Sequence, residues 1–85
     1  MDLILVGGVA GSGKSVALGA LEDCGYYAAG NLPVSLIAPT AEYLCDSGQE
    51  RVAMTVDLRI GEGASGLPAT IVRLREAGRS VRFLV

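Results

Sequence analysis

Eight residues near the start of the chain combine glycines, one cation and a hydroxyl at a spacing that suits a phosphate group. Gly8 to Ser15 read G-V-A-G-S-G-K-S, which fits the pattern G-x-x-x-x-G-K-[ST]. Glycines permit tight backbone turns in which successive N–H groups converge on phosphate oxygens. Lys14, the only lysine of the chain, would place its charge near the β- and γ-phosphates, and Ser15 would offer a hydroxyl to Mg²⁺. The segment predicts a triphosphate-binding loop; a glycine-rich turn with an incidental Lys-Ser pair is the alternative.

Such a site also needs an acidic side chain for the metal shell, at the carboxyl end of a neighbouring strand. Asp57 ends the run V-A-M-T-V-D, which has the form of such a strand, and Arg59 would point to the same side. We therefore expect Ser15 and Asp57 to hold Mg²⁺, and Lys14 and Asp57 to be the catalytic residues. The alternative for Asp57 is a hydrogen bond within a turn. The segment 30–33, G-N-L-P, is interpreted as a turn that could also face the nucleotide.

These residues need a scaffold, and the hydrophobic pattern predicts one. Apolar runs at 3–7, 26–29, 52–56 and 81–85 are typical of strands, and those at 3–7 and 52–56 suit strands buried on both faces. Helical patterns cover about 14–24, 34–46 and 68–77, each followed by glycine, and Pro39 should kink or break the second. Glycines at 61–66 indicate a flexible loop. The expected order is β-α-β-α-β-α-β, an α/β fold with a mostly parallel sheet and right-handed crossovers.

Length and composition limit the class of protein. Eighty-five residues make one domain at most, and the chain is 51% hydrophobic with a net charge of −2. It has no basic run that would suggest nucleic-acid binding, and Arg73, Arg75, Arg79 and Arg82 are interpreted as a solvated face. The absence of histidine excludes Ser-His and Cys-His nucleophiles, and Cys24 and Cys45 are expected to be small buried hydrophobes. With no signal peptide and no membrane span, we expect a cytoplasmic protein that does not contact membranes.

Longer stretches resemble one family. G-V-A-G-S-G-K-S-V-A-L, A-L-E-D-C-G-Y-Y, N-L-P-V and V-D-L-R, in this order, resemble the bacterial P-loop nucleotide-binding proteins of the RNase adapter family, the RapZ and YvcJ type. The resemblance implies a P-loop NTPase three-layer sandwich, of which residues 1–85 would be the N-terminal portion, without the C-terminal domain. It implies ATP and GTP binding with weak hydrolysis. The residues it assigns to ATP are Gly8, Val9, Ala10, Gly11, Ser12, Gly13, Lys14 and Ser15, and those it assigns to GTP are Asp57, Leu58, Arg59 and Ile60.

The sequence departs from the family pattern at three positions. Ala10 replaces the usual serine, Gly30 the usual aspartate of D-N-L-P, and Ile60 the asparagine of D-x-R-N. Gly30 removes a carboxylate from the expected crevice, and Ile60 weakens the assignment to guanine. The best-known member of the family is an adapter that delivers a small RNA to a ribonuclease in the control of amino-sugar synthesis. The resemblance places RNA and ribonuclease binding in the C-terminal domain, which residues 1–85 do not include.

Three hypotheses follow. The first is a nucleotide-binding regulatory module with slow ATP or GTP hydrolysis, because no second arginine cluster or lid is visible to stabilise transition-state charge. The second is a small-molecule kinase of the P-loop class, which would also need an acceptor site and a lid. The third is a chain too incomplete to fold or bind. An open sheet edge and an uncovered face lead us to expect that the chain can associate with itself.

Overall fold

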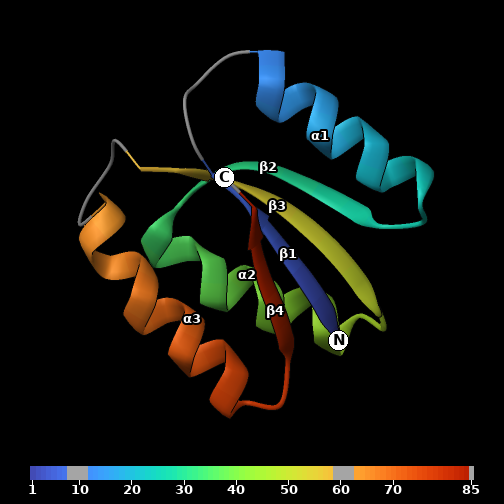
Figure 1. The fold of residues 1–85 in the computed structure, drawn as a ribbon. Helices are drawn as coiled ribbons and strands as arrows, with labels where there is room; N and C mark the ends of the chain where they lie inside the picture. The colour runs from blue at the N-terminus through green and yellow to red at the C-terminus, as the bar shows by residue number, and fades with distance from the viewer. Residues whose placement is uncertain (8–11, 59–62, 85) are drawn as a thin grey trace.

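A single parallel sheet organises the computed structural model, which describes residues 1–7, 12–58 and 63–84, with the backbone alone at 12–15 and 63–64. The strands lie in the order β2-β3-β1-β4, and every pair is parallel. The elements along the chain are β1 (Asp2–Val6), α1 (Ser12–Asp23), β2 (Tyr27–Pro33), α2 (Val34–Asp46), β3 (Arg51–Asp57), the 3-10 turn η1 (Gly63–Gly66), α3 (Leu67–Glu76) and β4 (Ser80–Leu84). The predicted α/β fold and element order are confirmed (Figure 1).

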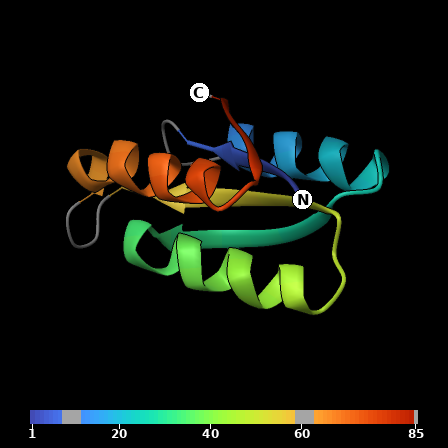
Figure 2. The same ribbon diagram turned by 90° about the horizontal axis from the view of Figure 1, so that it is seen from below.

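The two central strands are buried on both faces, as their continuous apolar runs predict. β1 pairs with both β3 and β4, and all but the first residue of β1 and of β3 are buried. Because the crossover connections of a parallel sheet place helices on its faces, the apolar side chains on both sides of these strands are covered. Figure 1 shows α1 on one side of the sheet and α2 and α3 on the other, and Figure 2 shows α1 and α2 on opposite sides of β2 and β3.

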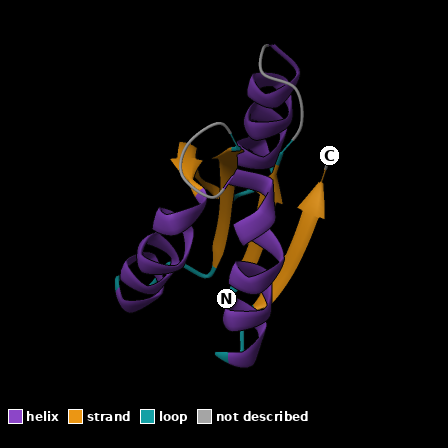
Figure 3. Ribbon diagram, turned by 90° about the vertical axis from the view of Figure 1, so that its left-hand side faces the viewer, coloured by secondary structure: helices purple, strands orange, loops and turns teal. Residues whose placement is uncertain are grey.

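The main core lies between the sheet and the pair α2 and α3, which lie side by side across the strands in Figure 3. Both helices direct an apolar stripe inward, and the α2 residue Ile37 is completely buried. The buried residues of this layer are Leu3, Leu5, Val34, Ile37, Ala41, Leu44, Val52, Met54, Val56, Leu67, Leu74 and Val81. Burying a side chain of this size stabilises the fold by about 1.5–3 kcal/mol relative to its exposure, so this layer holds the sheet in place.

Two predicted irregularities have a different form. Residues 30–33 are not a turn: they continue β2, whose pairing with β3 shifts register between Ala29 and Leu32. Pro39 lies inside α2 without breaking the helix assignment, and its side chain is exposed, so its ring points away from the core. The loop expected at 61–66 contains η1 over its last four residues, while Gly61 lies outside the described residues.

Two predictions about side-chain burial are wrong. Cys24 is exposed and Cys45 is half-buried, and both are free thiols. Arg79 is not solvated: its side chain is only 9% exposed, and its Nη2 lies 2.8 Å from Glu42 Oε1. Arg79 follows α3 and reaches the side of α2, so this ion pair joins the two helices. The other three arginines of the predicted set are exposed.

A polar cluster joins three segments at the amino edge of the sheet. The Tyr26 hydroxyl donates a hydrogen bond to Asp2 Oδ2 (2.7 Å), and Arg82 Nη2 donates to the same oxygen (3.0 Å) and to the Tyr26 hydroxyl (3.1 Å). The bond from Tyr26, followed by the contact with Arg82, lowers the pKa of the Asp2 carboxyl below its usual value. The cluster therefore connects β1, β4 and the segment after α1 at the edge opposite to the one where α1 begins.

Candidate functional site

The carboxyl edge of the sheet brings the predicted site residues to one place. β1 ends at Val6, and α1 starts at Ser12, so a strand, a short connection and a helix occur where the glycine-rich motif requires them. Gly8 to Gly11 lie outside the described residues. Ser12 to Ser15 form the first turn of α1, so the backbone of Lys14 and Ser15 lies at a helix N-terminus, where N–H groups have no intrahelical partner.

Gly7 fixes how the chain leaves β1. It is buried, and its N–H donates a 2.8 Å hydrogen bond to the carbonyl of Leu84 in β4. A Cβ atom on Gly7 would lie 2.6 Å from Cζ and 2.9 Å from Cε1 of Phe83, closer than real Cβ contacts. The ring of Phe83 therefore packs directly on the backbone before the motif, and only glycine fits there without a shift.

Asp57 lies at the same edge. The register pairs Thr55 with Val6, so Asp57, two residues later, ends β3 beside the point where the chain leaves β1. Its side chain is 3% exposed, and it shares a sheet face with Thr55 because alternate residues of a strand point the same way. The buried side chain takes part in interactions within the protein. The structure thus places Asp57 where the sequence predicts a metal-shell acid, while the role itself stays a prediction.

The remaining predicted residues are only partly described. Leu58 follows Asp57 and is half-buried, and Arg59 and Ile60 lie outside the described residues. The GTP assignment of residues 57–60 therefore stays an expectation from the resemblance. Glu22 and Asp23, at the far end of α1, are exposed and lie away from this edge.

The sequence interpretation missed the role of Thr55. It is buried to 6% exposure on β3, and its Oγ1 accepts a hydrogen bond from the backbone N–H of Asn31 in β2. Thr55 and Asp57 are the two buried polar residues of the described chain. The signal was present: a hydroxyl in the run V-A-M-T-V needs a partner once it is buried.

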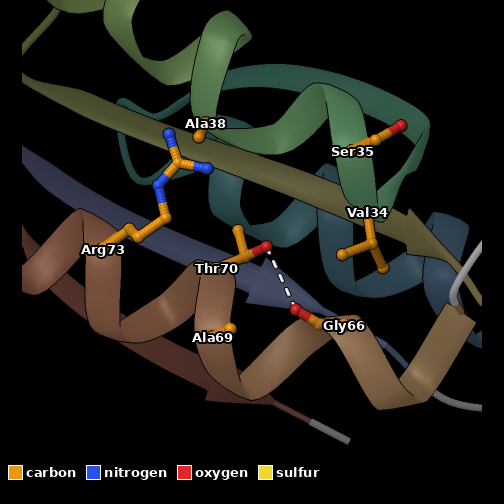
Figure 4. Close-up of a pocket in the computed structure, with 7 residues that line it drawn as sticks. All are labelled: Val34, Ser35, Ala38, Gly66, Ala69, Thr70 and Arg73. Atoms are coloured by element: carbon orange, nitrogen blue, oxygen red, sulfur yellow. Dashed lines mark hydrogen bonds between the residues drawn. The ribbon is translucent and has the colours of Figure 1, made fainter.

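A shallow pocket lies on the other face of the sheet, between the N-terminal halves of α2 and α3 (Figure 4). Its volume is about 260 Å³. Arg73 extends across it toward Ala38, and the Thr70 hydroxyl donates a 3.2 Å hydrogen bond to the Gly66 carbonyl. Because the pocket lies between α2 and α3, it is separated from α1 by the sheet.

Comparison with known proteins agrees with this geometry. The RapZ-like N-terminal domain family matches residues 1–82. The chain belongs to this family. A nucleotide-binding protein of Laribacter hongkongensis is 50% identical over 84 residues, which cover 99% of this chain and 30% of that relative. Nucleotide-binding proteins of Thiobacillus denitrificans and Paraburkholderia phytofirmans are 43% and 47% identical over 99% of this chain, and over 30% and 28% of their own length.

The parallel α/β sheet of this member of the RapZ-like N-terminal domain family is consistent with the P-loop fold that the resemblance implied. The chain spans about 30% of the length of the curated relatives that it matches. Within the described ranges, no helix is both long enough and apolar enough to cross a bilayer.

Proposed function

We propose that this RapZ-like N-terminal domain binds a nucleoside triphosphate with Mg²⁺ at the carboxyl edge of β1 and β3. The observation that carries the proposal is the pairing of Val6 with Thr55, which puts buried Asp57 next to the exit of β1, from which the glycine-rich motif leads into α1. Three relatives are named as nucleotide-binding proteins, which supports the proposal.

Each group in the proposed site has one role. The backbone N–H groups of Gly8 to Ser15 and the N-terminus of α1 receive phosphate oxygens, which carry the negative charge that this end of a helix favours. Lys14 adds a charge at the β- and γ-phosphates. Ser15 and Asp57 would hold Mg²⁺ through their oxygen atoms, and the ion would supply positive charge that stabilises the triphosphate. ATP and GTP share this triphosphate, so both are proposed ligands.

Calorimetry with Mg·ATP tests the proposal. Lys14→Ala should weaken binding by at least about tenfold, because a point charge on the phosphates is lost. Arg73→Ala is the matched control, because it also removes one cation, but from α3 on the opposite face of the sheet. The exposed guanidinium of Arg73 makes no hydrogen bond or ion pair with another described residue, and this variant should bind Mg·ATP as tightly as the unchanged chain. Equal affinities for Lys14→Ala and the unchanged chain, with the fold intact by circular dichroism, would contradict phosphate capture by the motif.

We further propose that hydrolysis is slow and that the domain acts as the nucleotide-sensing part of an RNase-adapter-like regulator of amino-sugar synthesis. Partners such as RNA and a ribonuclease would be bound outside residues 1–85. Radiolabelled ATP distinguishes this proposal from a small-molecule kinase: phosphate should pass to water alone. Transfer of the label to any member of a metabolite panel would favour the kinase.

A further inference from the structure

The bulge in β2 is an irregularity that the fold does not require. Ala29 pairs with Met54 and Leu32 with Val56, so two residues, Gly30 and Asn31, lie opposite the single residue Thr55. Such an extra residue bends a strand and changes the direction of its side chains, and bulges are frequent next to binding and active sites. This one lies near the carboxyl end of β2, at the edge where α1 begins.

Thr55 holds the bulge. Its Oγ1 accepts the backbone N–H of Asn31, so a side chain takes the place of the carbonyl that a regular ladder would provide. Asn31 has φ of 58°, the left-handed region, which asparagine tolerates better than most residues. Gly30 is not demanded by the backbone: a Cβ there would make ordinary contacts, 3.5 Å from Thr55 Oγ1 and 4.0 Å from Leu18 Cδ2.

The proximity of Gly30 to Leu18, whose Cδ2 would lie 4.0 Å from a Cβ on Gly30, locates the bulge relative to the proposed nucleotide site. Leu18 is three residues after Ser15, about one helical turn or 5 Å along α1. β2 runs toward the carboxyl edge of the sheet, whereas α1 runs away from it. One or two residues of β2 beyond Gly30 therefore span the same length as the helical turn from Leu18 back to Ser15. Asn31 therefore lies about level with the first turn of α1, on the strand next to Asp57.

The side chain of Asn31 is available to a ligand. Asn31 is exposed, and its side-chain amide makes no hydrogen bond to another residue of the described ranges. An amide offers a carbonyl oxygen, which suits a hard cation such as Mg²⁺ or a water bound to it. The left-handed backbone at position 31 would by itself explain why the residue is asparagine. It does not explain the bulge, which brings this residue to the carboxyl edge.

We propose that Asn31 contacts the hydrated magnesium of the bound metal–triphosphate through its amide oxygen, and that Thr55 is the positioning residue that holds it there. The inference rests on the proposed function, because it concerns the same site. It adds a residue from a third strand to those expected from β3 and from the motif after β1.

Binding of ATP with and without Mg²⁺ tests the contact. Asn31→Gly keeps the left-handed backbone and removes only the amide, so Mg·ATP affinity should fall about tenfold while affinity for ATP in excess EDTA stays unchanged. An unchanged Mg·ATP affinity would overturn the role of Asn31. An equal loss of affinity with Mg²⁺ and in EDTA would also overturn it, because the effect would then not require the metal.

Thr55 is tested with a matched pair. Thr55→Val keeps the shape and removes the acceptor, and should reproduce the metal-specific loss of Asn31→Gly; Thr55→Ser keeps the hydroxyl and should bind like the unchanged chain. Wild-type affinity in a folded Thr55→Val would overturn the positioning role. If the unchanged chain binds no ATP at all, the proposed function itself fails, whereas normal binding that is insensitive to Asn31→Gly refutes this inference alone.

Discussion

Replacing Gly7 with alanine should destabilise the domain through one contact with Phe83. The added Cβ would lie 2.6 Å from Cζ of that ring, so the ring or the strand must move. Overpacking of this kind costs about 1–3 kcal/mol, and the reduced freedom of the unfolded chain returns about 0.4–1 kcal/mol. The net loss should be about 1–2 kcal/mol, equivalent to a fall in Tm of roughly 5–15 °C for a domain of this size.

Thermal melts of the unchanged chain and three variants measure this contact. The variants are Gly7→Ala, Phe83→Leu and the double variant. Because leucine leaves room for the new methyl group, the double variant should be more stable than the sum of the single changes by about 1 kcal/mol.

Gly19→Ala is the control for the general effect of adding a methyl group to a glycine. Gly19 lies in α1, where a Cβ would meet nothing within 4 Å, so this change should stabilise the domain by about 0.5–1 kcal/mol. If the loss of stability in the double variant of Gly7 and Phe83 equals the sum of the two single losses within about 0.3 kcal/mol, the steric reasoning is refuted.

Three further predictions concern stability. Ile37→Ala leaves a cavity at a fully buried position and should cost about 2–5 kcal/mol in urea unfolding; a cost below 1 kcal/mol would mean that the core collapses around it. The folded pKa of Asp2 is lowered from 3.8, so the stability it contributes is present above that value and is lost as the pH falls through the folded pKa. Asp2→Asn should therefore melt earlier than the unchanged chain at pH 7, and this difference should shrink as the pH falls below 3.8. Gly48 has φ of 92° and open space around it, so Gly48→Ala should lower the free energy of unfolding by about 1–2 kcal/mol. Gly30→Ala should not destabilise the domain. Equal Tm shifts for the two variants would contradict the argument from backbone conformation.

The sequence predicted the parallel sheet because the period of its apolar residues is a local property. The apolar runs before Gly7 and before Asp57 are short and are typical of strands covered on both faces. The glycines at 25, 48 and 78, all with φ near 90°, follow the helical segments as their type predicts. The position of Asp57 at the carboxyl edge follows from its place at the end of such a run, so it too could be predicted.

The bulge could not be predicted, because its cause is not local. The letters G-N-L-P favour a turn by their own propensities. The strand continues through pairing with β3, 24 residues later, where Thr55 accepts the N–H of Asn31 and Leu32 and Pro33 pair with Val56 and Asp57. Arg79 was misjudged for the same reason: its partner Glu42 lies on another helix. A register and an ion pair between distant elements depend on tertiary structure, which single-sequence patterns do not record.

The sheet order also has a consequence for the order of folding. β1 takes its position between β3 and β4, and Asp2 pairs with Arg51, 49 residues further along the chain. At about 5–20 residues per second of synthesis, β1 waits roughly 2–10 s before its first sheet neighbour exists. During that interval the backbone of β1 has no strand to pair with, and the apolar side chains of Leu3 to Val6 lack the strands beside which they are buried. The formation of the sheet centre therefore depends on contacts of high sequence separation, and pairing of β1 with β3 is the step that covers this apolar segment.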